Sequence, residues 1–115
     1  MNPYGLKPEV LEMMINIFRN YPAVEQVILF GSRAKGTQKL GSDIDLCLVG
    51  KLDETILGRI DNDLDDLLLP YEFDLISFET ITHTDLLNHI SVVGKTIYRS
   101  STRRAPTSSP KQRQR

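Results

Sequence analysis

The stretch Ser42-Asp-Ile-Asp-Leu-Cys-Leu-Val49 is the most informative part of the sequence, because it places two carboxylates in an otherwise apolar run. A second run, Tyr71-Glu-Phe-Asp-Leu-Ile-Ser-Phe78, carries another acid, Asp74. Both runs are typical of buried strands, in which residues two apart lie on the same face, roughly 7 Å apart. Neighbouring strands lie about 4.8 Å apart, so Asp43, Asp45 and Asp74 can converge.

Three converging carboxylates repel one another and raise one another's pKa values unless a cation neutralises them. Oxygen-only ligation favours magnesium over softer metals. The alternative for an isolated Asp-x-Asp beside a glycine is a turn in which the carboxylates cap backbone amides. These two strands therefore predict a magnesium site, with the turn as the alternative.

The remaining elements surround these strands. Apolar residues at helical spacing predict a first helix near residues 8–20 and a second one from Leu52 to Leu68, closed by Pro70. A strand is expected at residues 24–30 and another at 71–77, and a last helix is expected to begin at Thr84 as its N-cap and to stop before Gly94. Residues 95–98 are expected to form an edge strand. This alternation predicts an α/β fold, a mixed sheet with helices packed mainly on one face.

Length and composition bound the class of protein. The chain has 115 residues, 40% hydrophobic and 25% charged, as expected for one soluble globular domain. No apolar run approaches the length of a membrane span, and no signal peptide is apparent, so we expect a cytoplasmic protein without membrane contact. The single cysteine, Cys47, lies on an expected buried strand, which indicates packing and excludes a disulfide framework.

Charge divides the chain at residue 100. All fifteen acidic residues precede this point, whereas five of the fourteen basic residues follow it. We expect residues 1–100 to form the domain and residues 101–115 to be a disordered basic tail, because the tail has almost no apolar surface to bury. Nucleic acid contact is expected only as a weak interaction of this tail.

A turn with phosphate-binding character follows the first strand, in Phe30-Gly-Ser-Arg-Ala-Lys-Gly36. Gly31 lets the backbone approach a phosphate, and Ser32 offers a hydroxyl and an amide. Arg33 and Lys35 add positive charge that can stabilise a developing negative charge. The spacing fits neither a P-loop nor a dinucleotide fingerprint. His83 and His89 do not have the spacing of a helical metal pair, which favours surface or capping roles.

The whole pattern, Gly31-Ser32, ten intervening residues, then Asp43-x-Asp45 and a later acid, resembles the DNA polymerase beta-like nucleotidyltransferase superfamily. It is most similar to the minimal nucleotidyltransferase (MNT) subfamily, over about residues 8–99. The resemblance implies a polymerase beta-like palm, and it implies that Gly31 and Ser32 contact the triphosphate. It further implies that Asp43, Asp45 and Asp74 hold magnesium, as two ions, and that ATP is the substrate.

The resemblance also implies a biological setting. Members of the subfamily are antitoxins that transfer AMP from ATP to a tyrosine of a partner HEPN ribonuclease toxin, so this chain is expected to be such a protein adenylyltransferase. The alternative is a non-catalytic antitoxin that binds nucleotide and neutralises its partner by occlusion. The three acids favour the enzyme.

Overall fold

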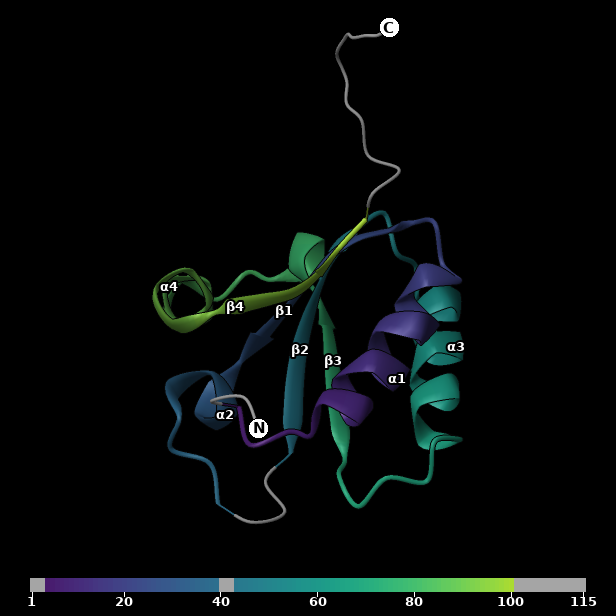
Figure 1. The fold of residues 1–115 in the computed structure, drawn as a ribbon. Coiled ribbons are helices and arrows are strands. Elements are labelled where there is room, and N and C mark those ends of the chain that lie inside the picture. Colours follow the sequence, from purple (N-terminus) through teal and green to yellow (C-terminus); the bar gives the residue numbers. More distant parts are fainter. Residues whose placement is uncertain (1–3, 40–42, 101–115) are drawn as a thin grey trace, which may run out of the picture.

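A computed structural model describes residues 4–39 and 43–100. The elements follow the order α1 (Pro8–Arg19), β1 (Val24–Phe30), α2 (Gly31–Lys35), β2 (Ile44–Gly50), α3 (Glu54–Asp65), β3 (Phe73–Ser77), the 3₁₀ turn η1 (Phe78–Thr80), α4 (Thr84–Val93) and β4 (Lys95–Arg99) (Figure 1). Local chemistry accounts for several of their ends. Pro8 begins α1, the Asp53 carboxylate accepts a hydrogen bond from the amide of Ile56 at 2.9 Å at the start of α3, and left-handed Gly36 ends α2.

The four strands form a mixed sheet in the order β3-β2-β1-β4. Strand β1 pairs antiparallel with β2 and β4, whereas β2 and β3 are parallel. A parallel pair requires a crossover connection, and α3 supplies it. The crossover places β3 beside β2 in a register in which Asp45 pairs with Asp74. The expected mixed sheet is confirmed.

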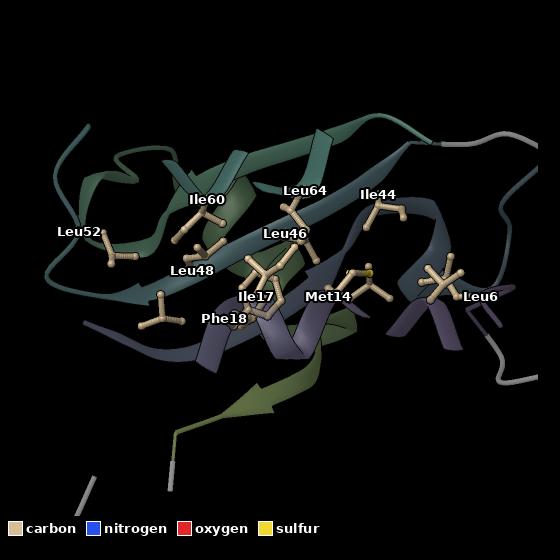
Figure 2. Packing of buried hydrophobic residues seen from close by; sticks show 14 of the residues in the cluster. Leu6, Met14, Ile17, Phe18, Ile44, Leu46, Leu48, Leu52, Ile60 and Leu64 are labelled. Atoms are coloured by element: carbon tan, nitrogen blue, oxygen red, sulfur yellow. The ribbon is translucent and has the colours of Figure 1, made fainter. Parts of the chain in front are cut away.

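One face of the sheet, here called the closed face, is covered by α1 and α3, which lie side by side (Figure 1). Side chains from both helices interdigitate with those of β1 and β2 (Figure 2). Several are fully buried, among them Phe18, Met14, Leu46, Leu48, Ile60 and Leu64. This contiguous cluster is the main core of the domain, and burying it is the principal source of stability.

The opposite face, here called the open face, is covered only in part. Helix α4 lies against it over β1, and α2 contacts α4. The buried cluster beneath is small, consisting of Phe30, Cys47 and Ile90. Helices therefore pack mainly on one face, as expected. The rest of the open face, over β2 and β3, carries the acidic side chains.

Three expected boundaries were wrong. Helix α3 ends at Asp65, and Leu68, expected in its apolar stripe, is 89% exposed with a left-handed φ of 56°. The chain must leave the helix and turn before Pro70, so the apolar periodicity overestimated the helix. The third strand begins at Phe73 instead of residue 71. Helix α4 begins at Thr84 itself, with His83 as its N-cap and no side-chain cap.

Residues 95–99 form the expected edge strand, and Cys47 is fully buried, as expected for packing. Burial raises the pKa of the Cys47 thiol to about 11, so little reactive thiolate is present at neutral pH. In the described part of the chain, no helix is long and apolar enough to cross a membrane. The expected basic tail, residues 101–115, lies outside the described residues.

Candidate active site

The three aspartates lie on the open face. Asp45 and Asp74 are direct register partners on the parallel strands β2 and β3. Asp43 immediately precedes β2 and, two residues before Asp45, shares its side of the sheet. Asp43 and Asp74 are exposed, whereas Asp45 is half-buried. The three acids therefore lie on the same side of the sheet.

The electrostatics of Asp45 reflect this crowding. Burial raises the pKa of the Asp45 carboxyl above its ordinary value, and the negative charges of Asp74 and Asp43 raise it further. Ionised Asp45 is thus disfavoured by its surroundings, which is the situation that a bound cation reverses.

Gly31 joins the turn after β1 directly to this carboxylate. Phe30, the last residue of β1, is the register partner of Asp45. Gly31 has a φ of 76°, in the left-handed region, and a Cβ atom there would overlap the carboxylate of Asp45. Both the backbone conformation and the close approach of Asp45 therefore require glycine. Ser32 follows in the first turn of α2 and is half-exposed.

Arg33 and Lys35, both expected to face phosphate, differ in their placement. Lys35 is exposed, but Arg33 is only 3% exposed. Its Nη1 donates a hydrogen bond to the carbonyl oxygen of Tyr4 at 2.9 Å, and its guanidinium carbon lies 4.8 Å from the centroid of the Tyr71 ring. The side chain of Arg33 therefore ties the N-terminal segment and the loop before β3 to α2. The buried position of Arg33 differs from the phosphate contact expected for it. Residues two apart on a helix, such as Arg33 and Lys35, point to opposite sides, so only Lys35 is exposed.

The carboxylates of this site suit magnesium when two of them at a time act as ligands. Within residues 4–39 and 43–100, no three acidic, histidine or cysteine side chains are close enough to hold one ion together. Magnesium commonly takes one or two carboxylates and completes its octahedron with water and substrate phosphates. Asp45 with Asp43, or Asp45 with Asp74, is a donor pair of that kind.

Asp74 also borders a shallow pocket between β3 and α3, which is lined by Leu57, Gly58, Asp61, Phe73 and Leu75 as well. Because α3, Phe73 and Leu75 belong to the closed face, this pocket lies on the closed-face side of the β3 edge. Asp61, on α3, is half-buried at this pocket. Glu72, which precedes β3, is exposed.

His89 is the site residue that the sequence did not reveal. The backbone amide of Gly31 donates a hydrogen bond to His89 Nε2 at 2.9 Å, and the His89 ring meets the Phe30 ring edge-on with centroids 6.1 Å apart. The surface role expected for this residue is wrong, because α4 folds back over the open face. Its bond to the first amide of α2 agrees with the capping alternative. A single histidine in an amphipathic helix carries no local signal of such a contact.

Comparison with known proteins agrees with this geometry. A family model described as "Polymerase beta, Nucleotidyltransferase" matches residues 12–103. Comparison with curated protein sequences finds no match.

Several solved structures share the fold. A toxin–antitoxin structure with AMP-PNP is 26% identical, with a TM-score of 0.65 over 79% of this chain and 74% of that chain. A tri-AMPylated Shewanella oneidensis HEPN toxin in complex with MNT antitoxin gives 21% identity and a TM-score of 0.62, over 83% of this chain and 74% of that chain. The toxin–antitoxin MntA–HepT gives 22% identity and a TM-score of 0.62, over 82% and 74%. By its family match and its fold, this chain belongs to the polymerase beta nucleotidyltransferase family.

Proposed function

We propose that this protein is a magnesium-dependent adenylyltransferase that moves AMP from ATP to a hydroxyl group, a tyrosine, of a partner HEPN toxin and thereby acts as its antitoxin. One observation carries the proposal: Asp45 pairs with Asp74 across β2 and β3 while it also touches the Gly31–Ser32 turn. A carboxylate pair beside a phosphate-binding turn is what nucleotidyl transfer requires.

The residues of the chain divide the work. Ser32, at the start of α2, binds the triphosphate through its hydroxyl and amide, and exposed Lys35 adds charge stabilisation from the same short helix. Asp43 and Asp45 would hold magnesium, and Asp74 would contribute to a second ion. When bound, magnesium neutralises the triphosphate and makes the attacking hydroxyl more acidic.

Asp74 also accepts the proton of the acceptor hydroxyl, since it is exposed on the open face beside Asp45. The hydroxyl oxygen then forms a bond to the α-phosphorus, and the bond between that phosphorus and the bridging oxygen to the β-phosphate breaks. Pyrophosphate leaves with the electron pair of that bond. The acceptor keeps a phosphodiester-linked AMP.

The choice of partner and substrate is supported by the relatives. The similar structures include an MNT antitoxin bound to a tri-AMPylated HEPN toxin and a toxin–antitoxin structure with AMP-PNP. A cytoplasmic setting forms part of the proposal. A second candidate is neutralisation by occlusion alone, which the similar structures of toxin–antitoxin complexes also favour.

The decisive experiment mixes the purified protein with ATP, magnesium and a candidate HEPN toxin, sought in the neighbouring reading frame, and measures the intact mass of that partner. We expect the mass to rise by one or more AMP units, with substoichiometric antitoxin modifying all of the toxin. Asp43→Asn should prevent the mass change and retain complex formation. Neutralisation by a complex that never gains AMP would instead establish the occluding antitoxin.

A further inference from the structure

His89 occupies a fixed position beside the Gly31–Ser32 turn. The next residue, Ile90, is 5% exposed and packs with Phe30 and Cys47 in the small cluster of the open face. Helix α4 is thereby anchored on β1, and His89 is held at the end of that strand. Its ring meets the Phe30 ring at 81°, an edge-on contact that fixes the plane of the imidazole.

The hydrogen bond between Gly31 and His89 defines the state of the imidazole. A backbone amide can only donate, so Nε2 must present its lone pair to the Gly31 N–H group, 2.9 Å away. The imidazole is therefore neutral in this arrangement, with its proton on Nδ1. Side-chain acceptors that fix a backbone turn in this way specify its orientation as well as contributing energy.

Gly31 is held from two sides. On one side its amide is bound by His89, and on the other its α-carbon lies so close to the Asp45 carboxylate that a Cβ atom would overlap it. A shift of Gly31 therefore moves Ser32 relative to Asp45. The spacing between those two residues is what the transfer reaction depends on, because misplaced reactants lose rate steeply.

We propose that His89 is a positioning residue for nucleotidyl transfer: by accepting the Gly31 amide hydrogen bond, it sets the Gly31–Ser32 turn at the correct distance from Asp45. This role rests on the proposed function. It also changes which backbone amide is expected to contact the triphosphate, because the Gly31 amide is already bound by His89. Backbone contact to the triphosphate then comes from Ser32, while Gly31 provides the conformation and the close approach to Asp45.

The test compares two substitutions of similar size. In His89→Gln, the side-chain amide oxygen reaches about as far as Nε2 and can accept the hydrogen bond. In His89→Leu, the acceptor is lost but the helix is kept. We expect His89→Leu to lower kcat/KM for AMP transfer about 10–100-fold, and His89→Gln to retain most of the activity. His83→Leu, at the exposed N-cap of α4, is the control and should have no effect.

A second readout is independent of catalysis and uses the wild-type protein. Nitrogen NMR of the His89 ring should show a protonated Nδ1 and an unprotonated Nε2, and the Gly31 amide proton should shift in His89→Leu but not in His89→Gln. A ring protonated on Nε2 would overturn the proposal, as would equal activities of the Gln and Leu variants in an active enzyme. A wild-type protein that transfers no AMP would overturn the proposed function together with this role.

Discussion

The closed and open faces of the sheet are built from the same strands but have different roles. On β2, Leu46 and Leu48 point into the closed face and are fully buried, whereas Asp45 points to the open face with Asp74 beside it. The two-residue period of the strand alone separates them. A single strand thus contributes a core side and a reactive side, and substitutions one residue apart should have different consequences.

The difference is also one of stability. The closed face buries apolar side chains from two helices and stabilises the fold. The open face leaves Asp45 half-buried among like charges, so that its ionised form is disfavoured. The domain therefore keeps a destabilising charge on the open face, and the closed face offsets it.

Replacing Asp45 by Asn should have the largest effect on the open face. We expect AMP transfer to fall by at least about 10²–10³-fold, because the site works by electrostatics. Without divalent cations, the variant should be at least as stable as the wild type. The folded-state pKa of Asp45 lies above its ordinary value of 3.8, so the wild type loses stability as the pH rises from that value through the folded pKa. Melting curves from acid to neutral pH, without magnesium, measure this.

The variant removes the titrating group, so the gap between its melting temperature and that of the wild type should open over that pH range. Adding magnesium should narrow the gap by stabilising the wild type alone. If Asp45→Asn instead destabilises the protein at neutral pH, the carboxylate is a structural group and the contrast between the faces fails.

Leu46→Ala tests the closed face one residue away. The substitution removes a fully buried side chain, and we expect it to lower the free energy of unfolding by about 2–5 kcal/mol. Ile76→Ala, in the half-buried margin of the open-face cluster, is the matched control and should cost less. Urea denaturation measures both, and an equal loss would mean that the two faces contribute equally to stability.

Gly31→Ala tests the close approach between the turn after β1 and the Asp45 carboxylate. The added methyl group meets both an unfavourable φ and the Asp45 carboxylate, so AMP transfer should fall about 10–100-fold. Gly36→Ala is the control, because Gly36 has a similar φ of 78° but open space around its Cβ position. Steady-state kinetics should show the Gly36 variant nearly unchanged, and equal losses would make backbone strain the sole cause.

Whether the sequence could predict a contact of this site depends on whether strand geometry alone brings the two residues together. That Asp45 and Asp74 can lie close together followed from strand periodicity and strand spacing, whereas their direct register pairing is a finding of the structure. The burial of Arg33 did not follow from them, since it depends on Tyr4 and Tyr71, which come from two loops that only the folded chain brings together.

His89 was missed for the same physical reason. Its partner Gly31 lies 58 residues earlier in the chain. The contact between the two residues depends on how α4 packs over β1. Leu68 shows the converse error: a local apolar pattern continued past the point where the helix ends. Local periodicity predicts elements well, but not the contacts between elements that tertiary packing creates.

Tyr21→Phe should have the smallest effect. The Tyr21 hydroxyl donates to Asp63 at 2.5 Å and joins the end of α1 to α3 at the margin of the closed face. Because this contact is partly exposed, we expect a loss of about 1 kcal/mol or less. The hydrogen bond to Asp63, followed by burial, raises the pKa of Tyr21 above its ordinary 10.0. Its contribution is therefore complete below pH 10.0 and is lost as the pH rises through the folded pKa.

Denaturant unfolding at neutral and alkaline pH measures this difference. The gap between wild type and variant should close at high pH. A gap that persists unchanged would mean that the hydroxyl stabilises the protein by a route other than its bond to Asp63.

A metal–nucleotide complex is expected to bind on the open face, between Asp45, Asp74 and the Gly31–Ser32 turn. Paramagnetic Mn²⁺, added with a non-hydrolysable ATP analogue to the isotope-labelled protein, tests it directly by broadening the resonances of nearby amides. We expect broadening to centre on residues 31–32, 43–46 and 73–75 and to spare the outer surfaces of α1 and α3. Broadening centred on the acidic surface of α3, or unchanged by Asp45→Asn, would contradict it.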